Sequence, residues 1–556
     1  MAELEETSYP NEVPEGHPYR LLGIGFLLAV LYFLAYGFHG MSDTDQGFIS
    51  ALSYRVLQGE IPYVDFIYIR PPLSLYLHAF IQSFIPASLE ILGERFIFYL
   101  FMALSVFWTI RGLQHFFDFR KIGISTELFL VMAFACSVHN FPPMAWHTID
   151  GILFSSLGVY MVARRQKIYW HVFALFCFAA AALCKQAFYP MLVFGPALLF
   201  LQYGAKYAWK PAAIFGGIFL SLLGSIYLSY PEYSTAFLEQ SMGESRLTDL
   251  VDVAIVEYAK PFLLIVLPLL IVWRAHAIYT WRYLPAGIFG LAFWGLLGMH
   301  VYQSLKLDAY VAPSFGFSQA FWLIAVGVAV KSFWLNRAAF SFLLSLLSIG
   351  WCAGISWGYA NPMLFFTPIL FAFIYGLNEE LELSVPRYFY GVACILLIWV
   401  FAFLYQYPYR DQERDLLTAK PGMYVEKLTA LRTGEPFEEK LLELKDYFEK
   451  YDPNRTAVLP GYPMAHYLFN AHNPLPVDWA HNAEMNYGRL EDQLKLHISE
   501  EVEWVLLEKE ELDMFTEEDR YGSLLSGYVK ESWIPADTGA YFWLMKNPKL
   551  EPTSDQ

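Results

Sequence analysis

Apolar runs, each close to the length of a membrane-spanning helix, recur along the first 406 residues of the chain. A helix needs about 20 mostly apolar residues to cross the ~30 Å hydrocarbon layer of a bilayer. The composition agrees, because 56% of all residues are hydrophobic and only 16% are charged, outside the usual range of soluble domains. We therefore expect an all-α polytopic membrane protein with about 13 transmembrane helices. The runs lie around residues 21–38, 96–110, 126–138, 149–163, 168–183, 187–202, 211–230, 261–273, 283–301, 313–330, 338–351, 361–376 and 388–406.

The positive charges between these runs predict which side of the membrane each connection faces. With a cytoplasmic N-terminus, the cytoplasmic segments hold 14 Lys and Arg residues and the opposite side holds 7. This is the bias of the positive-inside rule. The first 20 residues lack a signal-peptide pattern, so we expect the first apolar helix to be retained. The predicted domains are a cytoplasmic tail at 1–20, a transmembrane domain at 21–406 with an exoplasmic loop at 39–95, and an exoplasmic α/β domain at 407–556.

The C-terminal segment has the pattern of a small α/β domain. It predicts an amphipathic helix over 422–450 and strands at 456–459, 503–507 and 540–545. From Tyr407 onward it holds 16 Lys and Arg against 29 Asp and Glu, a balance of -13 out of -16 for the whole chain. This acidity argues against nucleic acid and against anionic lipid as partners of the domain.

Cysteine usage excludes a disulfide framework in the C-terminal domain. All five cysteines lie in or beside apolar segments, and none follows Tyr407. No Cys/His spacing predicts a structural metal.

The loop at 39–95 predicts two short helices that lie along the membrane interface. Ser42 or Asp43 is placed to cap the first, which ends at Gly59. The second opens at Arg70-Pro71-Pro72 and runs to about Phe84, because proline is tolerated in a first helical turn.

Asp43 and Asp45 follow the first apolar run and are the leading candidates for chemistry. Ionisable groups beside lipid are costly to keep and are functional candidates for that reason. In the functional interpretation a carboxylate faces a cavity, either as an orienting or metal-binding group or as a general base. In the alternative, one aspartate caps a helix and the other is solvated.

Arg70 and Lys185 are candidates for binding phosphate. Arg70 precedes two prolines that fix its backbone, and a guanidinium can form paired hydrogen bonds with phosphate oxygens. Lys185 is a lone lysine in a tight connection on the side with few positive charges. The alternative for both is contact with lipid headgroups.

The connection that contains His139, His147 and Asp150 is also rich in polar groups. His147 and Asp150 are three residues apart and would share a helix face. The three side chains are candidates to bind a metal or orient an acceptor, and structural hydrogen bonding is the alternative. Asp65 is a weaker candidate, and its alternative is to cap the turn before Tyr68.

These motifs together resemble the membrane glycosyltransferases with the GT-C fold, and most the bacterial branch related to protein mannosyltransferases and aminoarabinose transferases. The resemblance covers about 50 residues and rests on Asp45-Gln46-Gly47, Leu57-Gln58-Gly59, Ile61-Pro62-Tyr63, Asp65-Phe66, Pro71-Pro72-Leu73 and the turn at Lys185. It implies an essential aspartate in the first exoplasmic loop, which is Asp45 here, with Asp43 as its neighbour. Two positions depart from the family. Gln46 stands where an acid is common, which weakens the case for a metal, and Arg70 stands where lysine is common, which keeps the positive charge.

The resemblance implies a glycosyltransferase of the inner (plasma) membrane. Its donor would be a polyprenyl-phosphate-linked sugar, its acceptor a glycan, lipid or protein on the exoplasmic face, and a divalent metal would be an optional cofactor. A single attack on the sugar would invert the anomeric carbon. A transporter or flippase for lipid-linked glycans is the alternative, although transporters usually carry broken helices and charges near the membrane midplane. A non-catalytic assembly factor is a third interpretation, and it would fit if neither aspartate were needed.

Overall fold

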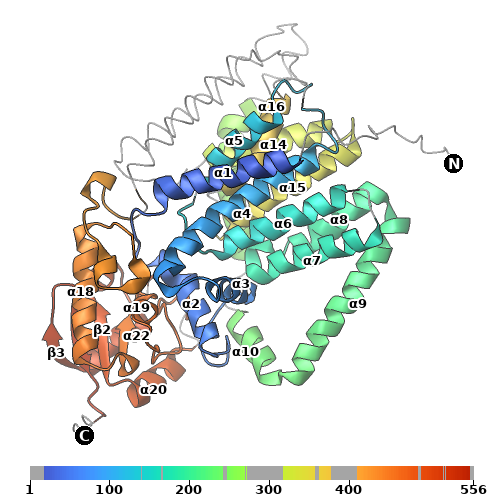
Figure 1. The fold of residues 1–556 in the computed structure, drawn as a ribbon. Coiled ribbons are helices and arrows are strands. Elements are labelled where there is room, and N and C mark those ends of the chain that lie inside the picture. The colour runs from blue at the N-terminus through green and yellow to red at the C-terminus, as the bar shows by residue number, and fades with distance from the viewer. Residues whose placement is uncertain are drawn as a thin grey trace.

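A computed structural model shows a helical bundle followed by a smaller C-terminal part with a sheet (Figure 1). It describes residues 18–119, 121–139, 141–164, 167–241, 247–268, 271, 317–356, 362–376, 408, 410–485, 490–517, 519 and 521–550. The fold class predicted from the sequence, mostly helical with a small C-terminal sheet, is confirmed.

The bundle contains the apolar helices of the chain. Among the described residues, four helical segments are long and apolar enough to cross a membrane: Pro18–Tyr36, Ala87–Leu113, Ala205–Ser229 and Arg337–Ile355. The predicted runs at 283–301 and 388–406 lie outside the described residues. The helices of the bundle are α1 (Pro18–Tyr36), α4 (Glu90–Leu113), α5 (Thr126–Val138), α6 (His147–Ala163), α7 (Ile168–Cys184), α8 (Met191–Tyr203), α9 (Ala205–Ser229), α10 (Pro231–Ser241), α11 (Leu247–Pro261), the π-helix η4 (Phe262–Val266), α14 (Phe317–Ser332), α15 (Arg337–Ile355), the 3-10 turn η5 (Pro362–Phe365) and α16 (Thr367–Tyr375).

Polar side chains cap the start of two of these helices, α5 and α15. Ser125 accepts a hydrogen bond from the Leu128 N–H at the start of α5, at 3.2 Å. Asn336 accepts one from the Ala339 N–H at the start of α15, at 3.1 Å. Such caps satisfy backbone donors that the first turn of a helix leaves without partners.

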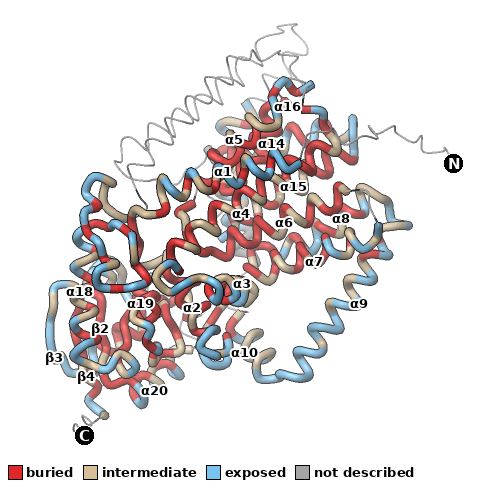
Figure 2. The backbone as a smooth tube through the Cα atoms, viewed as in Figure 1, coloured by how far each residue is buried: buried red, intermediate tan, exposed pale blue. Residues whose placement is uncertain are grey.

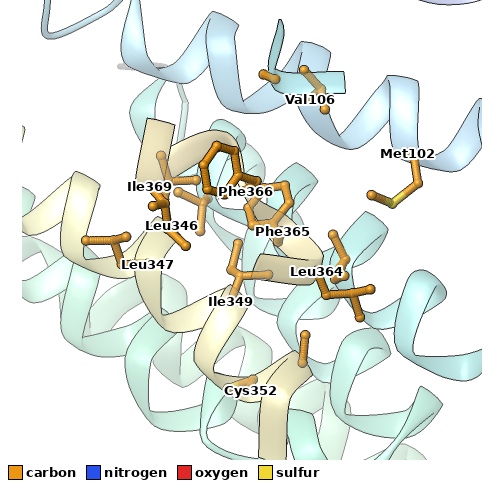
Figure 3. Packing of buried hydrophobic residues seen from close by; sticks show 14 of the residues in the cluster. Met102, Val106, Leu346, Leu347, Ile349, Cys352, Leu364, Phe365, Phe366 and Ile369 are labelled. Carbon is orange, nitrogen blue, oxygen red and sulfur yellow. The ribbon is translucent and has the colours of Figure 1, made fainter. Parts of the chain in front are cut away.

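The core of the bundle joins α4, α15, η5 and α16. Met102 and Val106 of α4 face Ile349 of α15 and Phe365 of η5, and all four are buried (Figure 3). The Phe366 N–H also donates to the Ser137 hydroxyl, at 3.3 Å. This packing fixes the end of α15, which matters for the site because Ser356 follows that helix.

Helix α9 is the most exposed of the long helices. None of its apolar window is buried inside the protein, and Figure 2 draws most of it as exposed. Leu220, Leu222 and Leu228 are among its exposed side chains. An exposed apolar helix of this length is what contact with lipid requires. The apolar helices therefore indicate an integral membrane protein.

The first loop lies between the bundle and the C-terminal part (Figure 1). It contains a 3-10 turn η1 (Asp45–Gly47), α2 (Phe48–Leu57), α3 (Leu73–Gln82) and a second 3-10 turn η2 (Ala87–Leu89). Both predicted helices are present, and Gly59 ends the first with a φ of 95°, where glycine is favoured. The prediction that Ser42 or Asp43 caps the first helix is wrong. Their side chains bind Thr44 and Lys440, and no side chain caps η1 or α2.

The C-terminal part, residues 408–550, is built around a four-stranded sheet of order β1-β2-β4-β3. β1 is parallel to β2, whereas β4 is antiparallel to both β2 and β3. Its elements are η7 (Arg414–Leu416), η8 (Pro421–Met423), η9 (Glu426–Leu428), α18 (Glu435–Lys450), η10 (Pro453–Arg455), β1 (Thr456–Leu459), α19 (Ala465–Leu468), α20 (Glu491–Glu501), β2 (Trp504–Glu508), α21 (Lys509–Met514), α22 (Leu524–Ser532), β3 (Ile534–Thr538) and β4 (Phe542–Lys546).

The three predicted strands are present, and β3 was not predicted. Its five residues are all exposed, so it lacks the alternation of buried and exposed residues that marks a strand. The helix predicted over 422–450 is too long at its N-terminal end. It begins only at Glu435, because Ala430 has a φ of 64° and Pro436 belongs to a first helical turn.

Candidate active site

Asp45 lies in η1, directly before α2, and pairs with Arg410 from the C-terminal part. The Asp45 Oδ2 is 3.0 Å from Arg410 Nη1, and the two side chains are 16% and 54% exposed. The turn is held by Gln46, whose Nε2 donates to the Pro143 carbonyl at 3.1 Å. Asp45 is thus set at the junction of the first loop, the second connection and the C-terminal part.

Asp43 turns toward a different partner. Its Oδ2 is 2.6 Å from Lys440 Nζ of α18, and Lys440 is also 2.6 Å from Glu508 at the end of β2. Burial alone would lower the pKa of Lys440, but the carboxylates of Glu508 and Asp43 hold that pKa well above its usual value. Asp43 thus joins the loop to α18 of the C-terminal part, whereas Asp45 contacts a different cation, Arg410.

Arg70 is paired in the structure, which the sequence did not reveal. Both of its terminal nitrogens donate to the Glu484 carboxylate, and the guanidinium lies 5.2 Å from the centre of the Phe48 ring. Burial acts to lower the pKa of Arg70, and Glu484 raises it above the usual value. Its backbone carbonyl accepts from the Tyr63 hydroxyl at 2.6 Å. A phosphate at Arg70 would have to replace or share the Glu484 contact.

Lys185 follows α7, in the connection to α8, and is a buried cation without a carboxylate partner in the described parts of the chain. Its Nζ donates to the hydroxyls of Thr148 and Ser356, at 2.9 and 2.7 Å. The ammonium also lies 5.9 Å from the centre of the Trp146 ring, and the residue is 7% exposed. Burial, with a smaller contribution from Arg70, lowers the pKa of Lys185 well below its usual value, although the Glu484 carboxylate acts to raise it. A buried charge with only neutral partners is costly, so this position favours an anionic ligand.

His147 lies close to these cations at the first position of α6. It is fully buried, and neither ring nitrogen has a hydrogen-bond partner within the described residues. Its ring centre is 4.5 Å from that of Trp146. The imidazole of His147 can therefore donate one hydrogen bond and accept another from a ligand that binds beside Lys185.

Asp150, one turn further along α6, belongs to a buried ionic network. Its Oδ1 is 3.3 Å from His78 Nε2, and His78 Nδ1 is 2.6 Å from Glu94 Oε2. All three side chains are at most 3% exposed. The i, i+3 relation predicted between His147 and Asp150 exists on α6, but His78 and Glu94 were not expected as partners of Asp150.

His139 and Asp65 lie apart from this cluster. The His139 ring is 5.3 and 5.7 Å from the rings of Tyr32 and Tyr36, near the end of α1. Asp65 is exposed, and its Oδ2 accepts from the Ile61 N–H at 2.7 Å, which is the turn-capping alternative named above. The structure does not bring either residue together with His147 and Asp150.

Three side chains of the C-terminal part lie at the site and were not predicted from the sequence: Trp479, His481 and Glu484. Trp479 lies 5.1 Å from Phe48 and 5.3 Å from His481, measured between ring centres. Burial lowers the pKa of His481, while Glu484 and Asp45 act to raise it. A signal was available, because these aromatic and polar residues lie in a long connection between β1 and β2, and long connections often carry function.

The described residues do not form a metal site. No group of three or more His, Cys, Asp or Glu side chains among them is arranged to hold a metal ion. Among the described residues, His147, Asp150 and His139 are not gathered into such a group.

Comparison with known proteins gives structural similarities only. No protein-family model and no curated protein matches the chain. It is similar to the Archaeoglobus fulgidus oligosaccharyltransferase in complex with Zn and sulfate, with 11% identity, coverage of 88% of this chain and 68% of that one, and a TM-score of 0.44. It is also similar to the archaeal oligosaccharyltransferase AglB from Archaeoglobus fulgidus with an inhibitory peptide and a dolichol-phosphate, with 13% identity, coverage of 88% and 69%, and a TM-score of 0.43.

A third similar structure matches nearly the full length of both chains. It is ArnT from Cupriavidus metallidurans in the apo state, with 10% identity, coverage of 96% of this chain and 98% of that one, and a TM-score of 0.45. All three TM-scores are below 0.5.

Proposed function

We propose that this protein is a membrane glycosyltransferase that moves a sugar from a polyprenyl-phosphate donor to an acceptor on the exoplasmic face. The observation that carries the proposal is Lys185, a buried ammonium held by the hydroxyls of Thr148 and Ser356 instead of a carboxylate. A donor phosphate would supply the missing negative charge. The first-loop motifs resemble those of GT-C glycosyltransferases, and that resemblance implies the same kind of donor, a polyprenyl-phosphate-linked sugar.

The donor phosphate binds at Lys185 and Arg70. Lys185 contributes an ammonium group in its protonated form, and Arg70 contributes two donors if the phosphate takes the place of Glu484. The bond from the anomeric carbon to the phosphate oxygen breaks, and the departing polyprenyl phosphate keeps the electron pair. Nearby cations stabilise that charge as it develops, so no acid is needed to protonate the leaving group.

Asp45 takes the proton of the acceptor hydroxyl as the acceptor oxygen bonds to the anomeric carbon. Its present partner Arg410 is 54% exposed on the side chain, and exposed ion pairs contribute only about 0–1 kcal/mol. An arriving acceptor can therefore displace Arg410 at little cost. One attack from the side opposite the phosphate inverts the anomeric carbon, by the geometry that governs inverting hydrolases.

Aromatic side chains form the walls between these charged groups. Phe48 lies 6.2 Å from Trp146 and 5.1 Å from Trp479, measured between ring centres. Their apolar faces suit the carbon side of a sugar ring and exclude water from the reacting centre. Asp43 serves the site indirectly, because its contact with Lys440 holds the C-terminal part against the loop.

The proposal is tested with purified protein reconstituted into vesicles and a set of radiolabelled polyprenyl-phosphate sugars. We expect the wild type to transfer label from one of them, and Asp45→Asn to reduce transfer at least 100-fold while the donor still binds. Asp446→Asn is the matched control, because Asp446 is exposed on α18. Full transfer by Asp45→Asn would remove Asp45 from the mechanism. Movement of donor across the vesicle without any transfer would favour the transporter alternative.

A further inference from the structure

A polar cavity lies between the C-terminal half of α2 and the C-terminal part of the chain. Its volume is about 450 Å³, within the usual range of small-molecule sites, roughly 300–1,000 Å³. None of its lining residues belongs to the active site described above. They are Ala51, Tyr54, Arg55, Gln58, Glu60, Asn454, His466, Tyr467, Asn470, Ala471, His472, Asn473 and Asp478.

The floor of the cavity is rigid because its charged groups bind one another. Arg55 Nη2 is 2.6 Å from Glu60, and Arg55 Nη1 is 3.0 Å from Asp478. Asn473 donates to Asp478 at 3.0 Å. Arg55 and Asp478 are 5% and 7% exposed, so the network is sheltered from solvent and its geometry is fixed.

The charge of this lining excludes an anionic ligand. Its one guanidinium is shared by the carboxylates of Glu60 and Asp478. Burial lowers the pKa of His466 to about 4, which leaves that ring neutral at physiological pH. His472 Nδ1 already lies 3.3 Å from Glu60, so a charge on its ring would only balance the second carboxylate. No positive charge remains for a phosphate or a carboxylate.

The rim of the cavity offers neutral hydrogen-bonding groups and an aromatic wall. Gln58 and Asn470 are exposed residues of the lining, and each carries a side-chain amide. Each amide both donates and accepts, as the hydroxyls of a sugar do. The half-buried Tyr54 ring offers apolar surface to the carbon face of a sugar, and the buried Tyr467 ring supports it from 5.6 Å away. Asn470 has a φ of 53°, a conformation that asparagine tolerates.

We propose that this cavity binds a neutral sugar unit of a glycan acceptor, at a distance from the unit that receives the transferred sugar. This inference rests on the proposed function, because it names the class of acceptor. Tyr54 is six residues after Phe48 on α2, and a rise of 1.5 Å per residue places it roughly 9 Å further along the helix. An extended oligosaccharide can therefore occupy the cavity and reach Asp45 at the other end of α2.

Binding is measured on the full-length protein in nanodiscs by saturation-transfer difference NMR. The probes are maltotetraose, chitotetraose and mannotetraose, which are neutral, and tetragalacturonate, which is anionic. The test variant is Gln58→Ala with Asn470→Gly. Both positions are exposed, and glycine keeps the left-handed backbone at 470, so the change removes the two amides without strain. The matched control is Tyr424→Ala, a half-exposed tyrosine of the same part of the chain outside the cavity.

We expect at least one neutral tetrasaccharide to bind the wild type and the control, and to bind the double variant at least 10-fold more weakly. Tetragalacturonate should not bind. The inference is overturned if no neutral probe binds the wild type, if the double variant binds equally well, or if the anionic probe binds in preference. If transfer depends on Asp45 but no saccharide binds, the acceptor-site inference is overturned and the proposed function stands. Saccharide binding together with transfer that ignores Asp45 would overturn only the proposed function.

Discussion

At the scale of single residues, the site depends on how each charge is paired. Asp45 has an exposed partner, Arg70 has a carboxylate partner, and Lys185 donates to two hydroxyls and to no carboxylate among the described residues. The types of residue were predictable from the sequence, since aspartate, arginine and lysine beside apolar segments are costly. Their partners were not, because Glu484 is 414 positions away from Arg70 and no local pattern links the two.

Lys185 should make donor binding depend on pH. Burial lowers the pKa of Lys185, and only the charged form attracts phosphate. Donor affinity should therefore rise as pH falls through this lowered pKa, with uptake of a proton on binding, and it should decrease as pH rises above it. Lys185→Met should weaken donor binding by roughly 10- to 100-fold, the value of a charge-assisted hydrogen bond, and remove this part of the pH dependence.

The measurement is donor affinity by titration calorimetry between pH 5 and pH 9. Lys450→Met is the matched control, because Lys450 is exposed in the last turn of α18. An unchanged affinity in Lys185→Met, or an unchanged pH profile, would show that the phosphate binds elsewhere.

At the scale of elements, the apolar runs predicted the helices well, whereas the polar residues beside them predicted the helix caps poorly. The apolar runs at 126–138 and 168–183 agree with α5 and α7 to within one residue. The expected caps at Ser42 and Asp43 were wrong because Ser42 bonds to the nearby Thr44, and Asp43 binds Lys440, 397 positions away. A long run of apolar residues is a strong local signal for a membrane helix. Whether a polar side chain caps a helix or forms a distant ion pair depends instead on the tertiary structure.

Gly47 should be essential for the close approach of η1 to the C-terminal part. A Cβ at this position would lie 2.3 Å from the Cβ of Met464, far inside van der Waals contact. Gly47→Ala should therefore destabilise the protein by roughly 1–3 kcal/mol, as overpacking does, and reduce transfer by displacing Asp45.

Thermal unfolding and the transfer assay measure the two effects of that change. Gly216→Ala on α9 is the control, since no atom lies within 4 Å of its added Cβ. Wild-type stability and activity in Gly47→Ala would mean that η1 does not need this contact.

At the scale of the whole molecule, the C-terminal part contributes side chains to the proposed active site. It supplies Trp479, His481 and Glu484 to one side of the site and Arg410 to Asp45. Three strands of this domain were predicted from the sequence, but none of its residues was predicted to belong to the site. Its contribution depends on how the domain packs against the loop, and that packing joins residues about 400 positions apart.

Lys440 should hold this arrangement together. The side chain is 9% exposed and lies between Asp43 and Glu508, whose own side chain is 1% exposed. Lys440→Met leaves the Glu508 carboxylate buried without a counterion, which should cost about 3–5 kcal/mol of stability. Removing that charge as well, in Lys440→Met with Glu508→Gln, should restore much of the loss.

Limited proteolysis of the C-terminal part and thermal unfolding measure this change. The double variant should resist protease better than the single variant. A single variant as stable as the wild type, or a double variant less stable than the single one, would contradict the role given to this ion network.

The most direct test of the central claim is a cryo-EM structure of the protein with a polyprenyl-phosphonate sugar, which mimics the donor but cannot release its sugar. The phosphonate is expected within hydrogen-bond distance of Lys185, with the anomeric carbon of the sugar facing the side where Asp45 lies. A headgroup bound away from Lys185, or a sugar that Asp45 cannot approach, would contradict the account.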